Sequence, residues 1–142
     1  MRDETEALIE AYYAAFNKAD WEAMLALLSE DVRHDINQSE TQTGKPAFRA
    51  FMAQMQRCYA ERLENIHILS DKSATRAAAE YIVHGRYIAT ADGLPEAKGQ
   101  SYILPGGAFF EVAGGRITRV TNYYNLQDWF CLLYTSPSPR DR

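Results

Sequence analysis

The side chains that could carry out chemistry in this sequence are a few individual titratable or hydrogen-bonding groups. A histidine and a carboxylate are adjacent at His34 and Asp35. Either could act as a general base, because each can accept a proton from a carbon or oxygen acid. Tyr12 falls within a helical pattern, and its hydroxyl could donate a hydrogen bond to an oxyanion. These residue types predict acid–base chemistry in a pocket, with Tyr12, His34 and Asp35 as the catalytic candidates.

The segment 32–37 alternates apolar and polar residues, which predicts a short strand. If Val32, His34 and Ile36 face the interior, His34 enters the pocket and Asp35 is exposed or paired with Arg33. If the alternation has the other phase, Asp35 lies beside apolar walls, where its pKa would rise. Tyr12 has a similar alternative, since an ordinary core aromatic fits its helix face equally well. The sequence leaves these alternatives open.

A second set of residues could orient a substrate. Amides can hydrogen-bond a carbonyl group without titrating, and the segment 122–125 has two amides and two phenols in four positions. Asn125 could instead cap a helix that follows it. His84 lies on the same side of its expected strand as charged residues. It could therefore be a surface residue instead of a substrate-binding one. The substrate-binding candidates are His84, Tyr102, Asn122, Tyr124 and Asn125.

Several kinds of site have no signature here. The glycine pairs at 106–107 and 114–115 lack the spacing and the following helix of a phosphate-binding loop. No serine lies in a Gly-x-Ser-x-Gly elbow, and the three histidines and two cysteines do not have zinc-ligand spacing. We therefore expect no metal and no cofactor, and expect Cys58 and Cys131 to be reduced thiols.

Length and composition limit the class of protein. A chain of 142 residues is the size of one domain, and 46% hydrophobic residues suffice for a core. The net charge of -4 and the absence of a basic run argue against a nucleic-acid partner. No apolar stretch reaches the ~20 residues of a membrane span, and the polar N-terminus does not resemble a signal peptide. These features predict a cytoplasmic protein without a membrane partner.

The order of the elements predicts an α+β fold. Helical periodicity covers the first half, with expected helices starting near Asp3, Asp20 and Gly44. Strand-like segments fill the second half at 63–69, 77–90, 100–112 and 116–125, and their short turns favour antiparallel pairing. The domain is expected to span 1–131. The polar, proline-rich end at 132–142 looks like translated adapter sequence and is expected to be a non-native tail.

The order of several short motifs resembles that of SnoaL-like and ketosteroid-isomerase-related proteins, which belong to the nuclear transport factor 2-like superfamily. The segments that carry this resemblance are YYAAFN at 12–17, DWEAMLALLSEDV at 20–32, Gly44, FFEV at 109–112, GRI at 115–117 and NYYN at 122–125. The resemblance covers residues 3 to 130. It implies a cone in which three helices pack on a strongly curved, mostly antiparallel sheet around an apolar pocket. It also implies a homodimer that forms through the sheet.

The resemblance carries over residue by residue. The oxyanion tyrosine of the isomerase falls on Tyr12, and its general-base aspartate falls on Ile36, with Asp35 the nearest carboxylate. Its second oxyanion acid falls near Gly107 or Ala108, which have no functional group. The acid–base aspartate of the SnoaL-type cyclases falls on Asn125, which cannot exchange protons.

Two functions from different classes follow. The leading hypothesis is a cofactor-independent isomerase or cyclase that enolises a small hydrophobic carbonyl compound. Asp35 or His34 would take the proton, and Tyr12 would donate to the enolate oxygen. The alternative is a non-catalytic module of the same fold that binds a lipophilic ligand or serves as a scaffold. An epoxide hydrolase would need an Asp-Arg-Asp set around the pocket, for which the sequence offers no convincing candidate.

Overall fold

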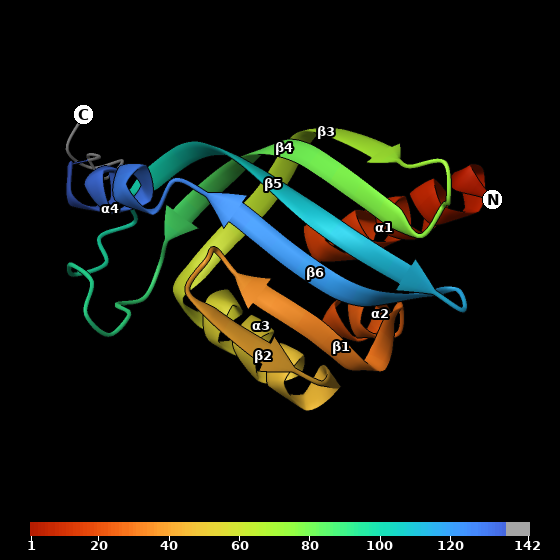
Figure 1. Cartoon of the computed structure of the whole chain (residues 1–142). Coiled ribbons are helices and arrows are strands. Elements are labelled where there is room, and N and C mark those ends of the chain that lie inside the picture. Colours follow the sequence, from red (N-terminus) through yellow and green to blue (C-terminus); the bar gives the residue numbers. More distant parts are fainter. Residues whose placement is uncertain (136–142) are drawn as a thin grey trace.

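The chain forms helices in its first part and long strands in its second part (Figure 1). The computed structural model describes residues 1–135. Its elements, in chain order, are α1 (Arg2–Asn17), α2 (Trp21–Leu25), β1 (Leu28–Ile36), β2 (Glu40–Thr43), α3 (Lys45–Cys58), β3 (Tyr59–Ser70), β4 (Arg76–Tyr87), β5 (Ser101–Ala113), β6 (Arg116–Tyr124) and α4 (Leu126–Thr135).

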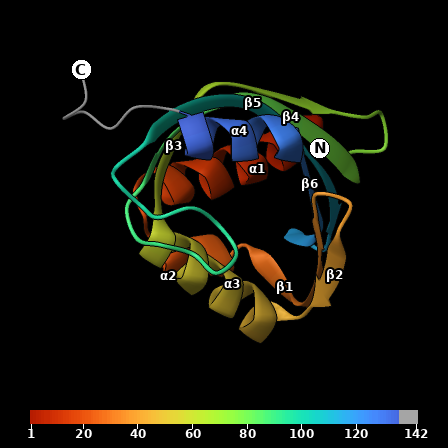
Figure 2. The same ribbon diagram turned by 90° about the vertical axis from the view of Figure 1, so that its left-hand side faces the viewer.

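The strands form one six-stranded sheet in the order β2-β1-β6-β5-β4-β3. Strands β3 to β6 pair antiparallel in sequence order, as their short links require, and β1 pairs antiparallel with β2. Only the β1–β6 pair is parallel among the described strands. Figure 2 shows β3, β4 and β5 curving over α1, with α3 on the side of α1 away from these strands. The predicted α+β cone with a curved, mostly antiparallel sheet is confirmed.

The core lies between the inner face of the sheet and the helices. Helical periodicity and strand alternation predict six core residues, and five of them are buried: Leu25, Leu28, Phe48, Met52 and Phe110. The sixth, Trp21, is partly buried and packs edge-on against Phe16, with the ring centroids 5.6 Å apart. Helical and strand periodicity therefore point these apolar faces inward, as predicted.

Two helix starts differ in how they are capped. Asp20 caps α2 at the predicted helix start, because its side chain accepts a hydrogen bond from the backbone N–H of Ala23 at 3.2 Å. The spacing of Asp3 and Glu6 predicts a capping box at the start of the first helix. This prediction is wrong, since α1 begins at Arg2 without a side-chain cap. Glu6 instead accepts a hydrogen bond from the Ser70 hydroxyl at 2.5 Å, which ties α1 to the end of β3.

The last described helix passes the expected domain boundary at residue 131. Helix α4 continues to Thr135, and Leu133 is 1% exposed. Its carbonyl oxygen accepts a hydrogen bond from the Gln100 side chain at 3.1 Å, so this stretch is packed onto the domain. Residues 136–142 of the expected non-native tail lie outside the described residues. Within residues 1–135, no helix is both long enough and apolar enough to cross a membrane.

Candidate active site

A cavity of about 390 Å³ lies between the inner face of the sheet and helices α1 and α3. Its wall is mainly aromatic and aliphatic, and its polar groups come from Tyr, Trp, Asn, Gln, His and Glu side chains. Small-molecule sites have this size and this combination of an apolar wall with a few polar groups. Within the described residues, no group of acidic, histidine or cysteine side chains is arranged to hold a metal ion.

His34 faces this cavity. Val32 is fully buried, His34 is 2% exposed and Ile36 lines the cavity, so the first of the two strand phases is the observed one. The imidazole packs against Phe48 and Phe51, with ring centroids 4.4 Å and 4.8 Å away.

The two ring nitrogens of His34 differ in their surroundings. Nε2 lies 3.3 Å from the Asn122 amide nitrogen, whereas Nδ1 is buried with no hydrogen-bond partner in the described structure. Burial lowers the pKa of His34 to about 4, although the nearby Asp35 charge opposes this shift. The imidazole is therefore neutral at neutral pH.

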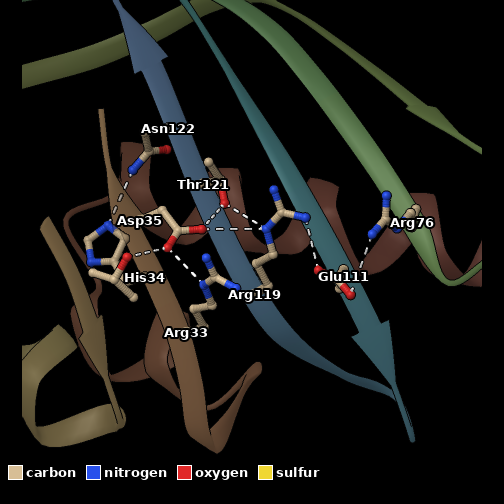
Figure 3. A network of polar contacts seen from close by, with 9 residues as sticks. Arg33, His34, Asp35, Arg76, Glu111, Arg119, Thr121 and Asn122 are labelled. Atoms are coloured by element: carbon tan, nitrogen blue, oxygen red, sulfur yellow. Dashed lines mark hydrogen bonds and ion pairs between the residues drawn. The ribbon is translucent and has the colours of Figure 1, made fainter. Parts of the chain in front are cut away.

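Asp35 points to the other face of the sheet, away from the cavity (Figure 3). Its carboxylate accepts hydrogen bonds from Thr121 Oγ1 at 2.6 Å, Thr41 Oγ1 at 2.8 Å and Arg33 Nε at 2.9 Å. Partial burial would raise its pKa, but these hydrogen bonds and the Arg33 charge lower it to about 2. Asp35 is thus a fixed anion that joins β1 to β2 and β6.

Tyr12 lines the cavity from α1 and is 5% exposed. Its ring makes edge contacts with Tyr13 and Phe110, at centroid distances of 5.1 Å and 5.6 Å. Burial, with a smaller effect from Tyr81, raises the pKa of Tyr12 far above its usual range. The phenol therefore keeps its proton and can act as a hydrogen-bond donor.

The expected substrate-binding residues divide into two groups. Tyr102, Asn122 and Tyr124 line the cavity. His84 lies outside it on the outer face of β4, where its Nε2 is 2.8 Å from a Glu64 carboxylate oxygen. Asn125 also lies outside the cavity and caps α4, because its side-chain oxygen accepts a hydrogen bond from the Asp128 backbone at 3.0 Å.

Glu61 is a carboxylic acid of the cavity wall that the sequence patterns do not reveal. The Tyr102 hydroxyl donates a hydrogen bond to Glu61 Oε2. Burial raises the pKa of Glu61, although this hydrogen bond acts in the opposite direction. The available signal was the alternation of Tyr59, Glu61 and Leu63, which becomes visible only if the strand is extended back to residue 59.

Residues 9–120 match the family model of the SnoaL-like domain. The chain belongs to the SnoaL-like family. It is similar to two solved structures named as candidate polyketide cyclases. The Pseudomonas putida KT2440 protein is 57% identical, with 91% of this chain and 97% of that chain covered and a TM-score of 0.89. The Xanthomonas campestris pv. campestris protein is 52% identical, with 93% of this chain and 98% of that chain covered and a TM-score of 0.91.

A more distant structural neighbour is a Kribbella flavida protein named as a candidate ketosteroid isomerase. It is 28% identical, with 87% of this chain and 78% of that chain covered and a TM-score of 0.62. A search of curated proteins finds no match.

This SnoaL-like chain does contain a carboxylate–arginine–carboxylate set, but not in the cavity. Arg119 lies 3.6 Å from Asp35 and 2.9 Å from Glu111, and Figure 3 shows this network along the strands. The described cavity wall contains neither aspartate nor arginine. The charged set that an epoxide hydrolase of this fold requires is therefore not present around the cavity.

Proposed function

We propose that this SnoaL-like chain is a cofactor-independent enzyme that transfers protons on a small hydrophobic carbonyl compound, as an isomerase or a cyclase. The observation that carries the proposal is the neutral, buried imidazole of His34 in the wall of an apolar cavity. A titratable group whose pKa is strongly shifted by burial in a cavity wall is a candidate for proton transfer.

His34 would take a proton from the carbon next to the carbonyl group. In the observed arrangement the Asn122 amide nitrogen donates to the Nε2 lone pair, so the proton of the neutral imidazole is on Nδ1. Nε2 is therefore the nitrogen that would take the substrate proton, in place of its contact with Asn122. The electron pair of the broken C–H bond moves toward the carbonyl oxygen, where the Tyr12 hydroxyl donates a hydrogen bond. The enolate then accepts the proton at another carbon in an isomerase, or attacks a second carbonyl carbon in a cyclase.

The similar proteins support this class of reaction. The two relatives above 50% identity are named as candidate polyketide cyclases, and cyclisation by enolate attack needs the same base and oxyanion donor. A positioned base contributes about 10²–10⁴-fold and an oxyanion donor about 10²–10³-fold to the rate. We also propose a homodimer formed through the outer face of the sheet.

The test is hydrogen exchange on candidate substrates. Hydrophobic enones and β-dicarbonyl compounds are incubated with the protein in deuterium oxide, and loss of the α-hydrogen signal is followed by NMR. Exchange above the buffer rate that disappears in His34→Gln supports the proposal. Tight binding of lipophilic probes without exchange of any compound would favour the alternative, a non-catalytic binding module.

A further inference from the structure

Glu61, Gly85 and Tyr102 lie side by side on three neighbouring strands. Glu61 pairs with Gly85 across β3 and β4, and Gly85 pairs with Tyr102 across β4 and β5. A Cβ atom at position 85 would lie only 2.2 Å from the Tyr102 ring. The glycine therefore lets the Tyr102 ring cross β4 and bring its hydroxyl to Glu61.

The carboxyl group of Glu61 is set among phenols. The tyrosines whose pKa values respond to its charge come from four successive strands of the sheet, β3 to β6: Tyr59, Tyr81, Tyr102 and Tyr124. The described cavity wall contains no lysine or arginine to neutralise a carboxylate. Under these conditions burial favours the uncharged acid, while the Tyr102 hydroxyl stabilises the carboxylate that forms when the proton leaves.

Two side chains of the described wall remain as candidates for proton exchange once the phenols are set aside. Burial raises the pKa of every cavity tyrosine: Tyr12, Tyr13, Tyr59, Tyr81, Tyr102 and Tyr124. These phenols can donate hydrogen bonds but cannot readily release a proton. The remaining titratable groups of the described wall are His34 and Glu61.

We propose that Glu61, held by Tyr102 across Gly85, is the general acid of this cavity. This inference rests on the proposed function. The C–H bond of the substrate breaks and its proton passes to His34, while the electron pair moves to the carbonyl oxygen. Glu61 gives its proton to that oxygen, so an enol and a carboxylate form. In the second half of an isomerisation the enol proton returns to Glu61, and the imidazolium gives its proton to another carbon.

The first experiment measures the titration of Glu61 without any substrate. The protein is labelled with ¹³C at glutamate carboxyl groups, and the Glu61 signal is identified by its absence in Glu61→Gln. We expect its midpoint to lie above those of exposed glutamates. Tyr102→Phe should raise the midpoint further, by about one pH unit, because a hydrogen bond to the charged form is lost. Gly85→Ala should act in the same direction by displacing the Tyr102 ring.

The second experiment measures the pH profile of α-hydrogen exchange. The wild-type rate should fall at high pH with the Glu61 midpoint, and Tyr102→Phe should shift this fall upward. Glu61→Gln should slow exchange about 10²-fold and remove that limb. Glu64→Gln is the matched control, since Glu64 is on the same strand but pairs with Arg62 and His84 outside the cavity.

The two experiments separate this inference from the proposed function. A Glu61 midpoint equal to that of exposed glutamates, or one that Tyr102→Phe does not raise, overturns the inference. Exchange with an unchanged high-pH limb in Glu61→Gln also overturns it and leaves the proposed function standing. Absence of exchange with every compound overturns the proposed function and the acid role together, even if Glu61 titrates high.

Discussion

His34 and Asp35 are adjacent on β1, and the two faces of the sheet give them opposite electrostatic properties. The pKa of each is lowered, to about 4 for His34 and about 2 for Asp35. Burial lowers the pKa of the histidine, which therefore becomes neutral. In the aspartate, hydrogen bonds from Thr121, Arg33 and Thr41 outweigh partial burial and hold the group charged.

The difference between the two faces indicates where chemistry can occur. On the outer face, each oxygen of the Asp35 carboxylate already accepts hydrogen bonds from the protein. On the inner face, His34 Nδ1 and Trp21 Nε1 are buried without a partner in the described structure. Buried polar atoms are normally hydrogen-bonded, so these two unpaired atoms make the inner face the one whose polar groups the fold leaves unsatisfied. We therefore assign the reactive role to the inner face.

The largest effect is expected for His34→Gln. The amide cannot accept a proton near neutral pH, so α-hydrogen exchange should slow by about 10²–10⁴-fold. His67→Gln is the matched control, because His67 is exposed on β3 and outside this cavity. NMR exchange rates of both variants and the wild type provide the comparison. Equal rates in His34→Gln and the wild type would remove His34 as the base.

A smaller loss is expected for Tyr12→Phe. The substitution removes the hydroxyl but keeps the ring contacts with Tyr13 and Phe110, so the fold should be retained. The exchange rate should fall by about 10²–10³-fold through loss of one oxyanion donor. Tyr123→Phe, which changes a phenol 37% exposed to solvent, controls for the loss of a hydroxyl. Thermal melting checks stability, and a lowered melting temperature with normal exchange would make Tyr12 an ordinary core residue.

Element types and their order could be predicted because periodicity is a local property of the sequence. The phase of β1 could not, since alternation allows both faces and only packing against Phe48 and Phe51 selects His34. Glu61 was missed because α3 ends at Cys58 and β3 begins at Tyr59, with no glycine or proline to mark the boundary. The apolar stripe of the helix therefore seemed to continue through Tyr59.

The next prediction distinguishes the two faces of the sheet by how the free energy of unfolding changes at acid pH. The folded-state pKa of Asp35 is about 2, below the reference 3.8, so its stabilisation is present above pH 3.8 and is lost toward pH 2. The pKa of His34 falls from 6.5 to about 4, so stability should already decline as the pH drops through that range. Denaturant unfolding at several pH values should show stability falling over both pH ranges: an upper window from pH 6.5 to about 4 for His34, and a lower window from pH 3.8 to about 2 for Asp35.

Variants assign these windows to residues. Asp35→Asn should destabilise the protein by about 1–2 kcal/mol at neutral pH and remove the lower window, with little change in exchange rate. His34→Gln should remove the upper window alone. Loss of exchange in a folded Asp35→Asn protein would contradict the structural role of this carboxylate.

The smallest effect on the cavity is expected from a change on the outer face at Ile103. This side chain is 61% exposed, and Phe109 and Tyr123 on the same face are 47% and 37% exposed. Exposed apolar side chains grouped on one sheet face are typical of an isologous interface. Light scattering at micromolar concentration should therefore give about 32 kDa, twice the chain mass of 16.1 kDa.

Ile103→Lys should halve this mass and leave exchange nearly unchanged, because the cavity lies on the other face. A wild-type mass of one chain would contradict the dimer, and loss of exchange in Ile103→Lys would show that the two faces are coupled.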